Sequence, residues 1–216
     1  MSFAVGIYDL FSYTLPGVVY LILLVETFRL ITNLPLLFDP SNLAHILLAA
    51  ILSFLLGIVI NPISRSLWHL LFSYKRKSRE EITLEYIKER HPEADIRIKP
   101  NQWPVLVAHI RRDDIELANM IDRSKAYSIM LRNFSFGMFL LAVTQAIQFF
   151  SNGYSVIPGA FAILLILFAF TAGRESLLFD GWYYSSIFEH AVAGQLPISD
   201  LVKLKSKKAP IKKKGG

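Results

Sequence analysis

The stretch Leu43-Ala-His-Ile-Leu-Leu-Ala-Ala-Ile-Leu-Ser-Phe-Leu-Leu-Gly-Ile-Val-Ile60 runs for eighteen residues without an Asp, Glu, Lys or Arg. A helix of that length rises about 27 Å, which is close to the ~30 Å hydrocarbon core of a bilayer. Beyond it the chain passes Asn61-Pro62 and reaches Tyr74 before the basic run Lys75-Arg76-Lys77. We therefore expect a membrane span over about 43–62, on a helix that continues to 74.

Three more apolar blocks are long enough to cross the membrane. One covers about 8–30 with Pro16 inside it, and two cover about 133–150 and 154–172. Gly173-Arg174-Glu175 follows the last block, and we expect the span to end there. The sequence predicts an all-α membrane protein with four transmembrane helices, a small cytoplasmic insert between spans two and three, and a basic C-terminal tail. The expected segments are a first transmembrane hairpin (1–74), the insert (75–132), a second hairpin (133–172), and an amphipathic aromatic helix with the tail (173–216).

The composition favours the same class of protein. Hydrophobic residues make up 53% of the 216-residue chain and the mean hydropathy is +0.42. Soluble domains usually contain about 45–50% apolar residues. The chain has no cysteine, which excludes disulfides, thiolate catalysis, iron–sulfur clusters and cysteine-ligated zinc. A soluble enzyme with an ordinary core and a secreted disulfide-linked module are both excluded.

The basic residues are clustered and predict the orientation. Of the 23 Lys and Arg residues, thirteen fall in 75–133 and eight in 174–216. Arg65 belongs to the same side, and only Arg29 lies beside an opposite loop. The positive-inside rule assigns such clusters to the cytoplasm. We expect a multi-pass protein of a bacterial inner membrane, with both termini and the insert in the cytoplasm.

The insert shows the pattern of a folded module. Ser78 and Glu81 have the spacing of a capping box, so a helix should begin there and end at His91-Pro92. Its apolar stripe is expected to comprise Ile82, Tyr86 and Ile87.

Further along the insert, the segment 95–100 alternates and predicts a short extended piece. Trp103, Leu106, Val107 and Ile110 recur at helical spacing. From Asp114 no residue breaks a helix before Phe150. So small an insert makes a poor core of its own. We expect it to pack on the continued second and third spans or on copies of itself, as a membrane-proximal cap or as a ligand sensor.

Polar residues within the spans are the first candidates for a site. In the second span Ser53, Gly57 and Asn61 form a small and polar stripe on one face, a pattern that permits close helix packing with Asn as a hydrogen-bonding group. The third span carries a second set: Thr144, Gln145 and Gln148. Two interpretations remain open: packing inside a four-helix bundle, or a polar lining formed by Asn61, Gln145 and Gln148 in an oligomer. Pro16 and Pro62 are the candidate hinges.

No pattern for catalysis, a metal or a cofactor is present in the sequence, and we expect a non-enzymatic protein. The helix after span four, which includes Phe179, Trp182 and Phe188, should lie in the headgroup region or against the insert. The basic residues expected to contact anionic lipid or a partner are Lys75, Arg76, Lys77, Arg111, Arg112, Arg174, Lys207 and Lys208.

The layout resembles the small four-span membrane proteins of bacterial anti-phage systems, including those beside RNA-targeting CRISPR effectors. The resemblance rests on Phe11-Ser-Tyr-Thr-Leu-Pro16-Gly17, on the charged insert, and on Arg174 followed by an aromatic helix. It implies a channel-like homo-oligomer that senses infection through a cytosolic protein or a nucleic-acid-derived signal and then perturbs the membrane. The alternative is a membrane anchor, or scaffold, for a cytosolic partner complex.

Overall fold

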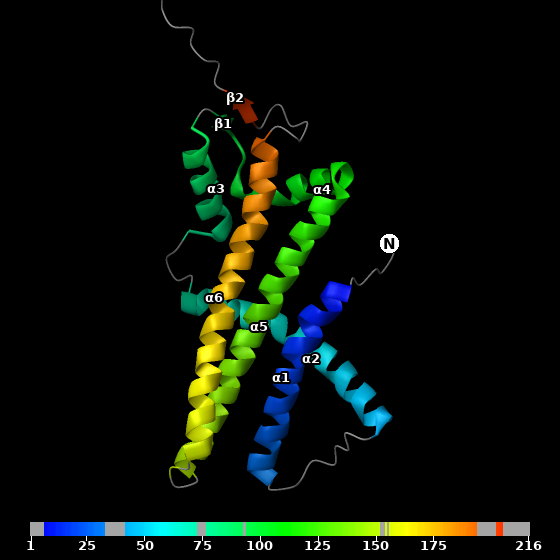
Figure 1. Cartoon of the computed structure of the whole chain (residues 1–216), viewed down its shortest axis with the longest axis vertical. Coiled ribbons are helices and arrows are strands. Elements are labelled where there is room, and N and C mark those ends of the chain that lie inside the picture. Colours follow the sequence, from blue (N-terminus) through cyan, green and yellow to red (C-terminus); the bar gives the residue numbers. More distant parts are fainter. Residues whose placement is uncertain are drawn as a thin grey trace, which may run out of the picture. The chain divides into compact units, whose positions relative to one another are not determined.

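The computed structural model describes residues 7–32, 42–72, 77–92, 94–151, 154, 156–193 and 202–204. Its four longest helices are α1 (Ile7–Thr32), α2 (Leu43–Phe72), α5 (Ile115–Ser151) and α6 (Val156–Val192) (Figure 1). All four are long and apolar enough to cross a membrane, judged by length and composition. This confirms the predicted helical membrane class and the predicted number of such helices.

The chain divides into two compact units. Unit 1 comprises residues 1–76 and 122–180, and unit 2 comprises residues 77–121 and 181–216. Because α5 and α6 are each continuous helices, each contributes one part of its length to unit 1 and the other part to unit 2.

In unit 1, α5 and α6 lie antiparallel and are joined by serine hydroxyls. Ser135 Oγ donates to the carbonyl of Ala169 at 2.6 Å, and Ser176 Oγ donates to the carbonyl of Ser128 at 2.9 Å. These two bonds set the register of the hairpin, in which residue 132 is level with residues 172 and 173.

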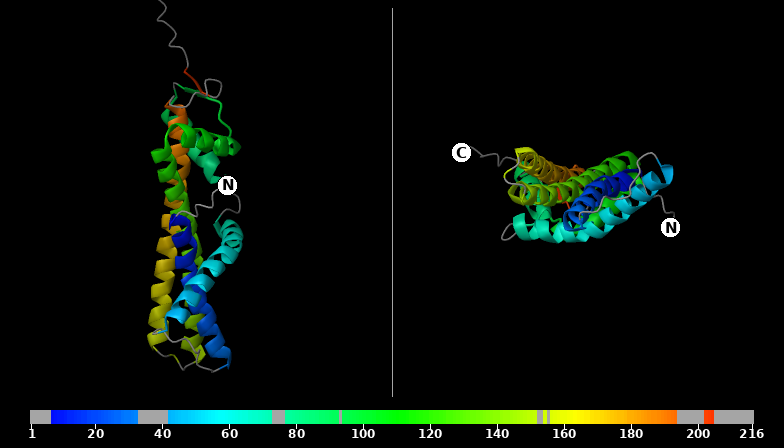
Figure 2. Two further views of the ribbon diagram at one scale, coloured as in Figure 1. Left: turned by 90° about the vertical axis from the view of Figure 1, so that its right-hand side faces the viewer. Right: turned by 90° about the horizontal axis from the view of Figure 1, so that it is seen from below.

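Helix α1 lies alongside α5 and points in the same direction (Figure 2). Ser12 Oγ donates to the carbonyl of Ala126 at 3.2 Å, and the hydroxyl of Tyr20 donates to the carbonyl of Asn133 at 2.9 Å. Both residue numbers rise together, so the C-terminal ends of α1 and α5 share one end of unit 1. That arrangement agrees with the two short loops predicted on one side of the membrane.

The crossing of α1 and α2 depends on two glycines. A Cβ atom on Gly17 would overlap the carbonyl of Ser53, and one on Gly57 would overlap the carbonyl of Tyr13. Ser53 itself is buried. Backbones approach this closely only where both helices carry small residues. Ser53 and Gly57 thus lie at the crossing of the two helices, and Gly17 is the matching position on α1.

Both candidate hinge prolines lie inside continuous helices. Pro16 is in α1 and Pro62 is in α2. Around Pro62, Ser66 Oγ donates to its carbonyl at 3.0 Å and Ser64 Oγ donates to the carbonyl of Asn61 at 3.1 Å. Neighbouring hydroxyls thus bind carbonyls in the turns around the proline, as is usual in membrane helices.

Unit 2 is built from short elements on the ends of the long helices. They are α3 (Arg79–Arg90), β1 (Ala94–Ile96), the 3₁₀ helix η1 (Pro100–Gln102), α4 (Trp103–Asp113) and β2 (Val202–Leu204), which pairs antiparallel with β1. Ser78 and Glu81 form the predicted capping box, and α3 ends before His91 as expected. The extended piece and the helix beginning at Trp103 are confirmed as well, whereas β2 was not predicted.

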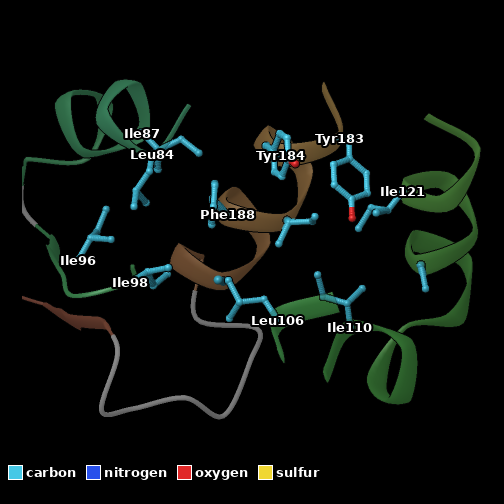
Figure 3. Packing of buried hydrophobic residues seen from close by; sticks show 13 residues of the cluster. Leu84, Ile87, Ile96, Ile98, Leu106, Ile110, Ile121, Tyr183, Tyr184 and Phe188 are labelled. Atoms are coloured by element: carbon cyan, nitrogen blue, oxygen red, sulfur yellow. The ribbon is translucent and has the colours of Figure 1, made fainter. Parts of the chain in front are cut away.

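The core of unit 2 surrounds the last turns of α6. Figure 3 shows Phe188 at its centre, with side chains of α3 on one side and side chains of α4 and α5 on the other. Phe188, Leu106 and Ile121 are fully buried. The aromatic segment therefore packs against the insert, the second of the two predicted places. The buried members are Leu84, Ile87, Ile96, Ile98, Leu106, Ile110, Ala118, Ile121, Tyr183, Tyr184, Ile187, Phe188 and Ala191.

The fourth span was expected to end at Gly173-Arg174-Glu175, but the helix itself does not end there. Helix α6 continues without a break from Val156 to Val192. Gly173 is needed for packing, because a Cβ there would come within 2.7 Å of the indole ring of Trp68. A glycine inside a helix costs about 1 kcal/mol relative to alanine, a modest cost for a long helix with buried contacts on both sides.

One expectation for the insert needs correction, and another needs an addition. Leu84 and Ile87 form the buried face of α3, whereas Ile82 and Tyr86 are exposed. The buried face is selected by α6, whose Tyr184 donates its hydroxyl to Glu80 at 2.6 Å, and positions 80, 84 and 87 share one side of a helix. The insert packs on the continued third long helix, α5, as expected, and also on α6, the fourth.

Candidate functional site

A cluster of polar side chains joins the two hairpins inside unit 1. Arg132 Nη2 and Asn133 Nδ2 of α5 both donate to Asn61 Oδ1 of α2, at 3.0 Å and 3.3 Å. Ser64 Oγ donates to Asn133 Oδ1, and Tyr20 OH donates to the Asn133 carbonyl. We call these five residues the Asn61 cluster.

Local sequence explains how the Asn61 cluster forms. Asn61 and Ser64 lie one turn apart on α2 and therefore face the same neighbour. Asn133 is fully buried, and it satisfies its side chain through Asn61 and Ser64. Buried polar groups without partners are costly, above all in a membrane, so this satisfied network favours one packing of the helices. The predicted interhelical hydrogen bonding of Asn61 is thus observed.

A second polar layer joins α5 to α6 further along α5. Lys125 Nζ is 2.7 Å from Asp180 Oδ1, and Ser128 Oγ is 3.4 Å from the same oxygen. Lys125 and Asp180 are both partly buried. This pair contains the carboxylate that acts electrostatically on Arg132.

The other candidate lining residues lie elsewhere on α5. Thr144 is buried and its hydroxyl donates to the carbonyl of Leu140 in its own helix at 3.1 Å. Gln145 and Gln148 are half-buried. They lie 12 and 15 residues beyond Asn133, about 18 and 23 Å along the helix. The structure therefore does not bring Asn61 together with Gln145 and Gln148 at one level of a single chain.

Four of the eight basic residues expected to contact anionic lipid or a partner lie among the residues that the structure describes. Lys77 pairs with Glu85 at 2.6 Å and Arg112 pairs with Asp113 at 2.8 Å, both on the surface. The hydrogen bond from Arg112 holds the pKa of Asp113 below its ordinary value. Arg111 and Arg174 are exposed. Lys75, Arg76, Lys207 and Lys208 lie outside the described residues.

Helix α4 carries a shallow, open hollow on its outer face, of about 430 Å³. The Nδ1 atom of His109 is buried there and has no hydrogen-bond partner among the described residues. Arg112 borders the same hollow with a positive charge. The remaining lining residues are Pro104, Val105 and Ala108. This surface could bind a small anionic or amphipathic group.

Sequence reasoning missed four members of the Asn61 cluster. Arg132 and Asn133 were treated as the edge of an apolar block, and Tyr20 as part of a span. Ser64 offered a weak signal, because it stands at helical spacing from Asn61 on the face already identified as polar. The pairing across helices had no local sequence signal.

Comparison with known protein families, with curated proteins and with solved structures found no match to this chain.

Proposed function

We propose that this protein is a non-enzymatic membrane effector, or channel-like subunit, whose cytoplasmic module controls its membrane helices. The observation that carries the proposal is the continuity of α5 and α6. Each helix is apolar over one part of its length and packs into the core of unit 2 over the other. A ligand that rearranges that core acts on residues belonging to the membrane helices themselves, and two-state shifts of helices are a common basis of switching.

The membrane helices offer large apolar surfaces for assembly. Only 11% of the most apolar 18-residue stretch of α2 is buried. The first turns of this helix expose Leu43, Leu47 and Ile51. In a bilayer such surfaces contact lipid or another copy of the chain. This supports a homo-oligomer, in which Gln145 and Gln148 of several copies could together line a polar path.

The trigger belongs to the insert. The hollow on α4 with His109 and Arg112 is where a cytosolic protein or a nucleic-acid-derived signal would bind, and the layout shared with anti-phage membrane proteins suggests a signal produced during infection. In this proposal both termini and the insert are cytoplasmic, in a bacterial inner membrane.

The test is flux from liposomes that contain the purified full chain, together with its mass in detergent. The proposal expects an oligomer that releases an encapsulated dye, either constitutively or after addition of extract from infected cells. Gln145→Leu with Gln148→Leu should keep the oligomer and reduce flux. Liposomes that retain the dye under every condition contradict the proposal. Unchanged flux in the double variant contradicts the polar lining by Gln145 and Gln148.

The second candidate is a membrane anchor for a cytosolic complex, and the outer face of α3 favours it. Ile82 and Tyr86 lie one turn apart and are exposed, an arrangement suited to docking a partner. An anchor predicts no flux and retention of one cytosolic protein. That retention should be lost in Ile82→Ser with Tyr86→Ser, whereas Val105→Ser, on α4, should keep it.

A further inference from the structure

Three arginines stand at the same end of the helices of unit 1. Arg132 is level with residues 172 and 173 of α6 by the register of the α5–α6 hairpin, which puts Arg174 within one turn of it. Arg65 lies one turn beyond Asn61, the residue that binds Arg132. In α5 the long apolar block begins immediately after Arg132. These positions mark a boundary between polar and apolar surroundings.

The guanidinium group of Arg132 makes fewer hydrogen bonds than it has donors for. A guanidinium has five N–H donors, and Arg132 gives one hydrogen bond, from Nη2 to Asn61. Its Nε is buried with no acceptor, and among the described residues it makes no ion pair. The side chain is only half-buried, so part of the guanidinium stays open. A buried charge without a counter-ion is unfavourable.

The surroundings add positive charge. Arg65 is exposed, has no hydrogen bond or ion pair within the part of the chain described, and its charge acts on Arg132. Asp180, the carboxylate whose charge acts on Arg132, is already bound to Lys125 at 2.7 Å. The positive charges of Arg65 and Arg132 therefore add to one another at this site.

We propose that Arg132 and Arg65 bind the phosphate group of an anionic ligand, with the headgroup of an anionic phospholipid as its source. Guanidinium groups match phosphate oxygens with paired hydrogen bonds, and a phosphodiester carries a negative charge that opposes both arginines. Trp68 packs against Gly173 at the same level, and tryptophan is typical of the headgroup region. This inference does not depend on the proposed effector function, because an anchor could use the same site.

The test titrates phosphatidylglycerol or phosphatidylcholine into the full chain in neutral detergent and counts bound lipids by native mass spectrometry. Phosphatidylglycerol should bind more tightly than phosphatidylcholine. Each of Arg65→Gln and Arg132→Gln should weaken its binding about fivefold, the usual effect of one basic residue near an anionic surface. Arg29→Gln, an exposed arginine at the opposite end of α1, is the matched control and should leave binding unchanged.

Inorganic phosphate distinguishes the two sources of the same chemistry. Displacement of phosphatidylglycerol by millimolar phosphate, absent in Arg65→Gln, would support the site and assign it to free phosphate. A lack of displacement supports the lipid. If Arg132→Gln does not fold, Arg65→Gln decides alone, because Arg65 makes no bond that stabilises the helices. Equal lipid binding by the wild type and Arg65→Gln, or equal loss in Arg29→Gln, overturns the proposal.

Discussion

At position 61 a single amide oxygen accepts hydrogen bonds from two residues of another helix. Removing it leaves the half-buried Arg132 guanidinium without its one acceptor among the described residues and frees Nδ2 of the fully buried Asn133. The consequence is thermodynamic, because interhelical hydrogen bonds in membranes contribute about 0.6 kcal/mol on average and up to about 1.7 kcal/mol.

We predict that Asn61→Leu lowers the stability of the protein by about 1–2 kcal/mol. The measurement is thermal unfolding in detergent, followed by circular dichroism. The matched control is Gln148→Leu, which makes the same chemical change at a half-buried amide that has no hydrogen bond among the described residues. Equal unfolding temperatures for Asn61→Leu and Gln148→Leu would contradict the role assigned to Asn61.

Glycines of unit 1 and unit 2 should respond oppositely to the same change. In Gly57→Ala the new methyl group meets the backbone of Tyr13, so α1 and α2 must separate, at a cost of about 1–3 kcal/mol. Gly181→Ala places a methyl in open space within α6, and it should be neutral or stabilise by up to about 1 kcal/mol. Thermal unfolding of the two variants measures the difference, and similar shifts would argue against a tight crossing.

At the scale of the elements, the caps and apolar blocks of the sequence were sufficient to place the helices. The capping box at Ser78 and the apolar block from Leu43 are local signals, and both were interpreted correctly. The sequence did not predict that α6 continues through Gly173, because a glycine can be a helix stop or a packing position, and only Trp68 on another helix distinguishes the two. The buried face of α3 was missed for the same reason, since α6 selects it through Tyr184.

The last turns of α6 lead to a prediction about unit 2. Phe188 is fully buried at the centre of that core, so Phe188→Ala should cost about 3–5 kcal/mol. Limited proteolysis of the full chain should then cut within 77–113, while the apolar parts of α1, α2, α5 and α6 stay protected by detergent or lipid. The control is Trp182→Ala, because Trp182 is 57% exposed, and it should preserve protection of the insert. Equal resistance of the two variants would show that unit 2 does not depend on α6.

At the scale of the whole molecule, helix directions and charge together predict a topology. The ends of α1 and α5 share one end of unit 1, and 22 of the 23 Lys and Arg residues belong to the other side by sequence. Hydropathy alone gives the number of spans, and with it which helix ends lie on the same side of the membrane. Contacts such as Arg132 with Asn61 join residues 71 positions apart, and no local pattern in one sequence specifies them.

The absence of native cysteine permits a direct test of that topology. We predict that a membrane-impermeant maleimide labels Val156→Cys from outside intact spheroplasts, and that Lys99→Cys is labelled only after permeabilisation. Both positions are exposed, so reactivity reports sidedness. The wild type, which contains no cysteine, is the negative control for both variants. The reverse pattern would invert the orientation, and labelling of both sites in intact cells would reject four spans.

The sequence separation within the core of unit 2 has a consequence for biosynthesis. Tyr184 and Glu80 are joined across 104 residues, and ribosomes extend chains at about 5–20 residues per second. The insert therefore waits about 5–20 s for the partners that complete its core. Those partners arrive only after both apolar stretches of the second hairpin have been made. If the second hairpin of a chain fails to enter the bilayer correctly, the insert of that chain stays unfolded. Proteases would then cut the exposed insert and degrade the misinserted chain.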